Sequence, residues 1–520
     1  MLRLTAQETA RAVGGRLIAG EEGRLLTHIS LDSRTMKGND LFVPVIGERV
    51  DAHDFICQAL ENGASAVFTS RHRTREDVER AVAEQTERKA AQGESAPAGA
   101  ANAAAFETGQ AFSGPASQRC LSAAWIAVDD TRRALQALGS YLRDQISIPL
   151  VGVTGSVGKT TTREMAAAAL SAGFRVYKTP GNSNSQVGVP ITITEIPPDA
   201  QIGVIELGMS EPGEMTRIAK VAQVDQAVMT NIGVAHIEQL GSRENILAEK
   251  LHIQDGMKEG GILYVNGDDD LLKNVKARPG CRTIIYGTGP DCDYRGKEIG
   301  LSGGFPVFTA VRRQTGERVR VRLHVYGNHM ILNALAALAV AAENGIPMER
   351  AAKALEAFNG LKGRQQIHHA GGITIIDDSY NASPVSMKAG IQVLCDMEVS
   401  GRRAAVLADM KELGPETREY HRQVGHFLAE HPVDLVVLLG DLAAEIGRGL
   451  SEGEAKEEQS RNGKNGPEIR HFSEKAELEE WLFSWIREGD CVLFKGSNSM
   501  GLGAAAADLL ARLQQSGKKA

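Results

Sequence analysis

The residues with the clearest capacity for chemistry lie between Ile148 and Met165, in the sequence IPLVGVTGSVGKTTTREM. A short apolar run, Pro149–Val153, predicts a buried parallel strand, and good helix formers follow from Thr161 onward. The glycine-containing turn between them offers backbone N–H groups to a phosphate, the helix adds the positive end of its dipole, and Lys159 adds a full charge. The predicted nucleotide-phosphate contacts are Thr154, Gly155, Ser156, Val157, Gly158, Lys159 and Thr160.

The spacing of this turn departs from the common phosphate-loop pattern G-x-x-x-x-G-K-[ST]. Val153 stands where the first glycine is expected, and Gly152 comes one residue too early. Thr160 follows Lys159 directly, where a hydroxyl can bind a magnesium ion carried by the phosphates. The alternative is a glycine turn with a surface lysine, but it does not account for the strand before the turn and the helix after it.

Three polar residues further along the chain belong to the same predicted sheet. Glu206 lies near the end of a predicted buried strand, Gly203–Leu207, and a carboxylate at the C-terminal end of a parallel strand commonly faces magnesium. His236 follows the next strand, and Lys250 lies on a predicted helix, Arg243–Ile253. Taken one at a time, these residues have simpler alternatives: a surface glutamate, a structural histidine and a surface lysine.

Composition excludes several classes of protein. The chain has 520 residues, 42% of them hydrophobic and 24% charged, as expected for a globular protein of about three domains. The formal net charge of -7 argues against a nucleic-acid partner. Six cysteines without metal-binding spacing indicate reduced thiols, and neither a signal peptide nor an apolar run of membrane-spanning length is present. We therefore expect a cytoplasmic protein that is a monomer and has no membrane span.

Alternating strand and helix patterns predict an α/β protein of three domains. The N-terminal domain is expected over residues 1–146, and a capping box of Thr5 and Glu8 predicts the start of a helix that ends at Ala12. Its other predicted elements are the strand Leu41–Ile46, the helix Asp54–Asn62, the strands Ala66–Thr69 and Ala123–Val128, and the helix Thr131–Arg143. Binding residues tend to lie in loops, and the loops of this domain carry Ser33, Arg34, Asp51 and His53.

Two segments read as insertions. The first covers about 71–120: charge dominates 71–90, which favours a helix, and 91–118 has almost no large apolar residue. The second covers 451–467 and is rich in Glu, Lys, Gly and Ser. Such segments bury too little apolar surface to offset the entropy lost on ordering. We expect the first to be poorly ordered without a catalytic role, and the second to be solvated.

The central domain is expected over residues 147–362, with a parallel sheet around the phosphate loop, a strand-rich part at 280–325, and a helix that carries His329 and Asn333 on one face. The C-terminal domain is expected over 363–520. It opens with a strand, Ile373–Asp377, and then repeats strand, loop and helix, which predicts an open parallel sheet of Rossmann-like type. No G-x-G-x-x-G motif is present, so a nicotinamide site is not expected there.

Several separated segments resemble the Mur ligases, the amide-forming enzymes of bacterial peptidoglycan synthesis. In the central domain they are TGSVGKTTT, GNSNSQVGVPIT, ELGMSEPGEM, NIGVAHIEQLGS and the pair His329 and Asn333. Outside it they are LDSRTMKGNDLFVPVIGERVDAHDF, IDDSYNASPVSM, LADMKELG and KGSNSMG. These last segments are similar to the branch of the family that uses UDP-N-acetylmuramoyl-tripeptide and D-alanyl-D-alanine. The most discriminating of them is Asp377–Asn381.

The resemblance implies a UDP-substrate-binding N-terminal domain, a central ATP-binding domain of the P-loop type and a C-terminal ligase domain. It implies an ADP-forming reaction in which ATP phosphorylates the terminal carboxylate of UDP-N-acetylmuramoyl-tripeptide, and the amine of D-alanyl-D-alanine attacks the acyl phosphate. A carboxylate is a poor electrophile, and phosphorylation supplies its leaving group. Such a transfer needs positioning and charge neutralisation more than covalent help from the protein.

The resemblance also implies a role for each matching residue. The implied catalytic residues are Lys159, Glu206, His236 and Lys250. Two Mg2+ ions would be held by Thr160, Glu206, His236 and a carbamylated Lys250 (N6-carboxylysine), because a carbamate turns this cation into an anion. Beyond the phosphate loop, the implied ATP contacts are Asn182, His329, Asn333, Arg364 and Asp378. The implied substrate contacts are Ser33 and Arg34 for the UDP part, Asn184 in the asparagine turn near the phosphates, and Ser379, Tyr380 and Asn381 near the incoming dipeptide.

Three residues depart from the family pattern. Met330 replaces an asparagine, His252 replaces a glutamate two residues after the implied carbamylated lysine, and Asn498 replaces an arginine. Three alternative functions remain open at this point. The chain could be a ligase that adds a different amino acid, a nucleotide-dependent switch that binds a partner without ligation, or a structural interaction protein.

Overall fold

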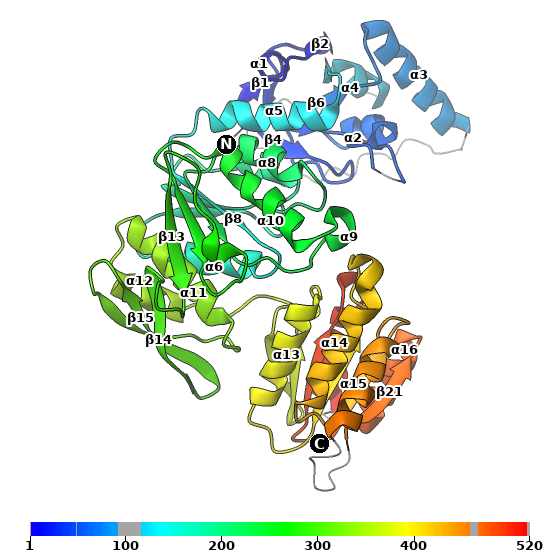
Figure 1. The fold of residues 1–520 in the computed structure, drawn as a ribbon. Coiled ribbons are helices and arrows are strands. Elements are labelled where there is room, and N and C mark those ends of the chain that lie inside the picture. The colour runs from blue at the N-terminus through cyan, green and yellow to red at the C-terminus, as the bar shows by residue number, and fades with distance from the viewer. Residues whose placement is uncertain (1, 48, 92–115, 458–465, 517–520) are drawn as a thin grey trace.

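Three β-sheets, each packed against helices, follow one another along the chain in the computed structural model, which describes residues 2–47, 49–91, 116–457 and 466–516 (Figure 1). The first sheet lies in the blue N-terminal part, the second in the green central part and the third in the yellow-to-red C-terminal part. All three contain parallel strands connected through helices, and the predicted α/β fold class is therefore confirmed.

The N-terminal sheet has the strand order β2-β7-β6-β5-β4, in which β2 is antiparallel to β7 and the other pairs are parallel. Its strands are β2 (Arg16–Ala19), β4 (His28–Ser30), β5 (Asp40–Phe42), β6 (Ala66–Thr69) and β7 (Ala124–Ala127). A two-stranded ribbon adds β1 (Leu4–Thr5) and β3 (Leu25–Leu26), and the helices are α1 (Ala6–Ala12), η1 (Ala52–Phe55), α2 (Ile56–Glu61) and α5 (Thr131–Arg143).

Two specific local predictions for this domain are confirmed. The predicted capping box of Thr5 and Glu8 is present at the start of α1, and α5 has the predicted bounds. The predicted strand Leu41–Ile46 is wrong beyond Phe42. Pro44 has no N–H to give to a sheet ladder, and its carbonyl oxygen instead accepts a hydrogen bond from the Thr131 hydroxyl.

The two predicted insertions are partly helical. Helix α3 (Arg75–Ala91) confirms the helix favoured over 71–90, whereas α4 (Ala116–Ser122) and α15 (Ala444–Glu457) correct the expectation for the end of the first insertion and the start of the second. Val78 and Val82 of α3 are buried in one cluster with Cys120 and Trp125. This charged helix therefore has one apolar face, which packs against the domain. Residues 92–115 and 458–465 lie outside the described part of the chain, and the prediction for them stays a prediction.

The central sheet has nine strands in the order β16-β15-β14-β13-β12-β11-β8-β10-β9. They are β8 (Leu150–Thr154), β9 (Val176–Lys178), β10 (Ile202–Glu206), β11 (Gln226–Met229), β12 (Ile262–Asn266), β13 (Arg282–Gly287), β14 (Tyr294–Ser302), β15 (Phe305–Arg312) and β16 (Arg318–Arg322). The β14–β15 and β15–β16 pairs are antiparallel and the others are parallel. Because β8 lies between β10 and β11, the loops after these three strands meet at one edge of the sheet.

The helices of the central domain are α6 (Lys159–Leu170), α7 (Gly188–Thr194), α8 (Glu214–Ala222), α9 (Ile237–Leu240), α10 (Arg243–Leu251), η2 (His252–Gly256), η3 (Leu272–Asn274), α11 (Met330–Glu343) and α12 (Met348–Glu356). Helix α11 is almost wholly apolar and is buried against α6 in one core cluster. This packing fixes α6, which begins at the phosphate loop, against the rest of the domain.

The C-terminal sheet has the order β17-β18-β22-β19-β20-β21, with only the β17–β18 pair antiparallel. Its strands are β17 (Gln366–Ala370), β18 (Ile373–Asp377), β19 (Arg403–Ala408), β20 (Leu435–Leu439), β21 (Glu468–Phe472) and β22 (Cys491–Lys495). The helices besides α15 are α13 (Pro384–Asp396), η4 (Gly414–Glu416), α14 (Thr417–Ala429), α16 (Lys475–Trp485), η5 (Asn498–Met500) and α17 (Leu502–Ser516). The two edge strands, β17 and β21, were not predicted, because half-exposed edge strands lack the apolar run that marks a buried strand.

The cysteines and the length and polarity of the helices complete the description of the fold. All six cysteines lie in the described residues, and none of them forms a disulfide. Across the described ranges, the helices are too short or too polar to cross a membrane.

Candidate active site

The turn between β8 and α6 can only be made with glycine at two positions. Gly158 caps α6 with φ 83°, and Gly155 has φ 149°. A Cβ atom at Gly155 would lie 1.9 Å from the Thr230 hydroxyl oxygen, closer than two atoms can approach. The ammonium of Lys159 donates to the Gly155 carbonyl at 2.9 Å, and burial lowers the pKa of Lys159. The geometry suits a phosphate cradle with a cation folded over it.

The loop after β11 braces this turn. The Asn231 side chain accepts from the Val157 N–H and donates to the Val157 carbonyl, both at 2.9 Å. The Ser156 hydroxyl accepts from the Gly233 N–H at 2.9 Å. Asn231 was not among the predicted site residues, although a polar residue directly after a strand neighbouring β8 is a signal that could have found it.

Glu206 ends β10 and is buried beside the phosphate loop. One carboxylate oxygen accepts from the Asn184 amide at 2.7 Å and from the Thr160 hydroxyl at 3.3 Å. The other accepts from Arg163 at 3.1 Å. Thr160, Asn184 and Glu206, predicted from three separate segments, therefore meet, and the surface-glutamate alternative is wrong. Arg163 was missed; its only signal was its place on the helix that follows the phosphate loop.

Lys250 lies on α10 with its side chain wholly buried, so the surface-lysine alternative is wrong. Its Nζ atom has no hydrogen-bond partner among the described residues. Burial, reinforced by the charge of Lys159, lowers the pKa of Lys250 well below its usual range. A neutral, buried amine is nucleophilic, and Lys250 therefore fits modification by carbon dioxide to a carbamate.

Oxygen donors suited to magnesium lie beside the phosphate loop. Thr160 and Glu206 bring a hydroxyl and a carboxylate together, and hard oxygen donors are what Mg2+ prefers. Within the described ranges, no three His, Cys, Asp or Glu side chains gather into a metal site. Mg2+ at a phosphate site usually takes one or two protein oxygens and completes its shell with phosphate and water, so the donor set fits.

His236 forms the start of α9 with a left-handed backbone, φ 63°. Its Nδ1 atom lies 2.8 Å from a carboxylate oxygen of Glu412, which belongs to the C-terminal domain. The His236 ring beside it lowers the pKa of Glu412. Glu412 lies in the LADMKELG segment and was not singled out as a site residue.

Two side chains at the start of the C-terminal domain reach the same area. The Arg364 guanidinium donates to the Thr160 hydroxyl at 3.1 Å, and it stacks 4.2 Å from the centre of the Tyr380 ring. Asp378 is buried, which raises its pKa, while the ammonium of Lys495 opposes this from 2.7 Å. Lys495 is itself buried and also donates to the Asn381 carbonyl at 3.2 Å. It was missed, although it opens the KGSNSMG segment.

The remaining predicted residues of these two domains are Asn333, His329, Asn182, Ser379 and Asn381. Asn333 accepts from the Thr162 hydroxyl at 3.0 Å, against the first turns of α6. His329 and Asn182 are exposed. Ser379 is buried and its hydroxyl donates to Asp377, whereas Asn381 is exposed.

The three departures from the family pattern have ordinary surroundings. Met330 is buried as the first residue of α11. His252 lies 2.9 Å from the Asp255 carboxylate. The Asn498 amide donates to the Tyr380 carbonyl at 3.2 Å, so it supports the loop that follows β18.

In the N-terminal domain, the predicted residues Ser33 and Arg34 contact their own neighbours. The buried Ser33 hydroxyl donates to Gln58 at 2.7 Å. Arg34 is paired with Asp32 at 2.8 Å, and this contact lowers the pKa of Asp32 to about 2. Neither Ser33 nor Arg34 lines the cavity of about 270 Å³ in this domain, whose lining residues are Ile46, Ser70, Asp129, Asp130, Thr131 and Arg132.

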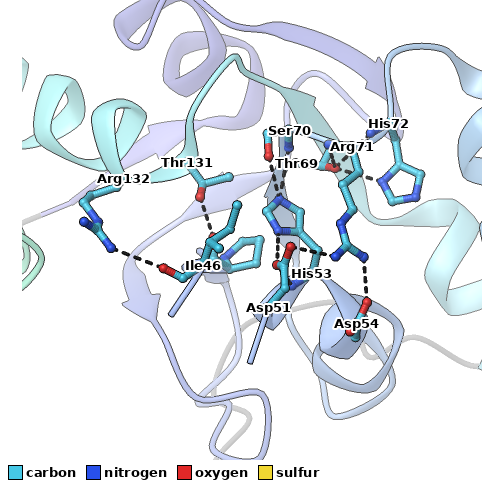
Figure 2. Close-up of polar contacts among 11 residues, drawn as sticks. Ile46, Asp51, His53, Asp54, Thr69, Ser70, Arg71, His72, Thr131 and Arg132 are labelled. Atoms are coloured by element: carbon cyan, nitrogen blue, oxygen red, sulfur yellow. Dashed lines mark hydrogen bonds and ion pairs between the residues drawn. The ribbon is translucent and has the colours of Figure 1, made fainter. Parts of the chain in front are cut away.

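A polar network stands beside this cavity. Figure 2 shows the His53 ring between Asp51, 2.6 Å from its Nδ1 atom, and Ser70, 3.0 Å from its Nε2 atom. Arg71 bridges Asp51 and Asp54 at 2.6 Å each. The network holds the loop after β5 against the end of β6, and it rigidifies one wall of the cavity.

Three family descriptions match successive parts of the chain. "Mur ligase family, catalytic domain" matches residues 25–140, "Mur ligase middle domain" matches 153–341, and "Mur ligase, glutamate ligase domain" matches 363–498.

Individual proteins match over almost the full length. The UDP-N-acetylmuramoyl-tripeptide–D-alanyl-D-alanine ligase of Bacillus subtilis is 34% identical over 98% of this chain and 99% of its own. A crystal structure of MurF from Acinetobacter baumannii superposes with a TM-score of 0.80 at 29% identity, covering 98% of this chain and 99% of that one. A structure of MurF ligase from Thermotoga maritima in complex with ADP gives a TM-score of 0.73 at 26% identity, covering 95% and 98%.

Proposed function

Because the chain belongs to the Mur ligase family, we propose that it joins D-alanyl-D-alanine to UDP-N-acetylmuramoyl-tripeptide and converts ATP to ADP. It is an ATP-dependent ligase of peptidoglycan precursor synthesis. The observation that carries this proposal is the similarity to the Bacillus subtilis ligase, 34% identical over 98% of the chain. The meeting of Thr160 and Glu206 beside the phosphate loop supports it.

The reaction proceeds in two chemical steps. ATP first phosphorylates the terminal carboxylate of the tripeptide, and the amine of D-alanyl-D-alanine then displaces phosphate from the acyl phosphate. The chain has to hold the phosphates in line with the carboxylate and to neutralise charge as it moves. Lys159 and the backbone N–H groups of the phosphate loop are placed for the first task.

Thr160 would hold one Mg2+, and Glu206 and His236, supported by a carbamylated Lys250, would hold a second. Mg2+ supplies positive charge to the transferring phosphoryl group. Lys250 supports this assignment because its buried amine has no hydrogen-bond partner among the described residues. A carbamate on this amine would add two oxygen atoms and a negative charge, which can bind a metal and accept hydrogen bonds. Arg163 keeps part of the Glu206 carboxylate neutralised before ATP arrives.

Substrate contacts are proposed from the matching motifs. Residues 1–146 bind the UDP part through Ser33 and Arg34, 147–362 form the ATP domain, and 363–520 form the ligase domain. The remaining ATP contacts are Asn182, His329, Asn333, Arg364 and Asp378, and the contacts to the reacting groups are Asn184, Ser379, Tyr380 and Asn381. We propose a cytoplasmic monomer, since the absence of disulfides among the six cysteines suits a reducing compartment.

The product mass tests the function directly. Purified protein is incubated with UDP-N-acetylmuramoyl-tripeptide, ATP, Mg2+ and D-alanyl-D-alanine. We expect a condensed product whose mass equals that of the tripeptide precursor plus D-alanyl-D-alanine less one water. One ADP and one phosphate should form for each molecule of product. Phosphate release with a single free amino acid and a shorter precursor would instead identify a sister ligase. A slow rate of ATP hydrolysis that does not change when D-alanyl-D-alanine is added would identify a nucleotide switch.

Removal of the phosphate-loop charge tests the mechanism. Lys159→Ala is expected to lower kcat by at least about 100-fold, because the charge that stabilises the moving phosphoryl group is lost. The fold should survive, since burial already disfavours this charge, and circular dichroism checks this. The exposed Lys273→Ala serves as the matched control. Turnover of Lys159→Ala equal to that control would exclude the phosphate role.

A further inference from the structure

One close side-chain contact links the central and C-terminal domains at the loop that braces the phosphate loop. The Nδ1 atom of His236 lies 2.8 Å from a Glu412 carboxylate oxygen, with 24% of the histidine side chain and 56% of the glutamate side chain exposed. Both residues have a left-handed backbone with φ 63°. Residues with a side chain rarely adopt this conformation, and the surrounding structure has to hold them in it.

The backbones around this pair are in close contact. Gly414, two residues after Glu412, has φ 65°, and a Cβ atom there would lie 3.2 Å from the Glu238 Cα atom. Val234 packs against the core of the C-terminal domain. The contact is therefore a packed interface rather than two long side chains meeting in solvent.

The same loop reaches the phosphate loop from its other end. Its Gly233 N–H donates to the Ser156 hydroxyl at 2.9 Å, and Asn231 forms two hydrogen bonds to Val157. Only two residues, Val234 and Ala235, lie between Gly233 and His236. The position of the C-terminal domain is thus connected to the phosphate loop through a short, braced segment.

We propose that Glu412 is a positioning residue, which holds the His236 ring for metal binding only when the C-terminal domain lies against the central domain. The inference rests on the proposed function, in which His236 helps to hold the second Mg2+. The Nδ1 atom of His236 faces the Glu412 carboxylate at 2.8 Å, and with the ring proton on this side the lone pair of Nε2 is the one available to a metal. Carboxylates that orient a metal-binding histidine in this way are typical partners of such ligands.

The arrangement gives the enzyme a way to delay phosphoryl transfer until its domains have closed. His236 belongs to the central domain and Glu412 to the C-terminal domain, so neither domain alone contains the complete arrangement. Assembly of a site by domain closure protects a reactive acyl phosphate from water. An exposed pair of side chains with no further role would contribute little to the timing of phosphoryl transfer or to the protection of the acyl phosphate.

Metal binding to the full-length enzyme tests this role without reference to turnover. Mn2+ replaces Mg2+ as the probe, and electron paramagnetic resonance counts bound Mn2+ in the presence of ADP and UDP-N-acetylmuramoyl-tripeptide. The wild type is expected to bind two Mn2+ ions. Glu412→Ala should weaken the second by about 10-fold or more, as loss of an outer partner typically does, while Glu412→Gln, whose amide oxygen still accepts from Nδ1, should stay within about 3-fold of the wild type.

Glu419→Ala provides the matched control, since Glu419 is an exposed carboxylate on α14 that contacts Gln423 of its own helix. In turnover, Glu412→Ala should lower kcat and leave the KM for ATP within about 2-fold, because the phosphate loop is untouched. In a His236→Asn background, Glu412→Ala should cause no further loss of Mn2+ affinity, since Glu412 acts through the ring.

Three results would overturn the inference. They are equal Mn2+ binding by Glu412→Ala and Glu419→Ala, a single Mn2+ bound by an enzyme that forms product, and an additive loss in the His236→Asn background. Failure of the proposed function is recognised separately, as absence of condensed product from the wild type.

Discussion

Lys250 shows how its surroundings change what a side chain can do. The same residue on an exposed helix would be a solvated cation, whereas here it is wholly buried with no hydrogen-bond partner for its Nζ atom in the described structure. Desolvation disfavours the charged form, and the neutral amine becomes a nucleophile. Glu206 and Asp378 are likewise buried, but each carboxylate has a cation within hydrogen-bond distance.

A prediction at this scale concerns the missing anion. Lys250→Ala is expected to lose at least about 100-fold in kcat, because a metal-binding charge is removed. Short carboxylic acids such as formate or acetate should restore part of the activity by occupying the space of the carbamate. Phosphate release in a titration of each acid measures this.

The matched control is Lys220→Ala, an exposed lysine on neighbouring α8. Lys250→Ala without any response to carboxylates, together with no carbon dioxide adduct on the wild-type lysine by mass spectrometry, would leave Lys250 with a structural role only.

At the scale of elements, strand order decides which loops meet. The phosphate loop follows β8, Glu206 ends β10 and Thr230 follows β11, and these three strands are neighbours in the sheet. Their C-terminal ends therefore share one edge, where ligands bind in open α/β sheets. The close approach of Gly155 to Thr230 is a direct result of this adjacency.

Gly155→Ala tests that adjacency. The new methyl group would collide with Thr230, and the backbone would be strained at φ 149°. We expect ADP affinity, measured by calorimetry, to fall by at least about 10-fold as the loop is displaced. Gly316→Ala has a positive φ but open space around its Cβ position, so it isolates backbone strain from collision. Equal ADP affinity of the two variants would show that Thr230 does not restrict the loop.

Substitution of Asp490 tests how much a buried, charged carboxylate contributes to the stability of the C-terminal sheet. It precedes β22 with a side chain only 2% exposed. Burial alone would raise its pKa, but hydrogen bonds from Arg402 and Arg487 outweigh burial and lower it below 3.8. Asp490→Asn is expected to reduce the free energy of unfolding by about 1–3 kcal/mol at pH 7.

The sign of the pH dependence follows from the lowered pKa. The charged contact stabilises the fold above the unfolded-state pKa near 3.8 and is lost as the pH falls below it. The stabilities of the wild type and Asp490→Asn, measured by thermal unfolding, should therefore differ by a constant amount above about pH 5 and approach each other as the pH falls below 3.8. Asp508→Asn, on the surface of α17, should show no such convergence.

At the scale of the whole molecule, the active site lies between two domains. Arg364 stands at the start of the C-terminal domain, donates to Thr160 of the phosphate loop at 3.1 Å and stacks on Tyr380 of its own domain. Together with the His236–Glu412 pair it ties the two domains at the phosphate loop. Figure 1 shows the yellow-to-red C-terminal domain beside the green central part of the chain.

Arg364→Ala is expected to lower kcat by about 10–100-fold, because closure positions the reacting groups. The radius of gyration with ADP bound, measured by small-angle X-ray scattering, should increase relative to the wild type, since one contact that favours closure is lost. Lys362→Ala, an exposed neighbour in the same linker, is the control. An unchanged radius together with unchanged kcat would remove Arg364 from the closing device.

The sequence by itself determined what depends on neighbouring residues. The phosphate loop, the capping box of α1, the bounds of α5 and the strand Ile373–Asp377 all follow from residues within one short segment. Their patterns of apolar, glycine and capping residues act over a few positions, and a sequence displays them directly. The resemblance of several such segments to the Mur ligases then supplied the family.

Only the tertiary structure decided how distant segments meet. Asn231, Arg163, Lys495 and Glu412 were missed because each gains its role from a partner far away in the sequence. The burial of Lys250 and the apolar stripe of α3 likewise depend on what packs against them. Sheet order and domain contact set these meetings, and both are fixed by the packing of the whole chain rather than by any local run of residues.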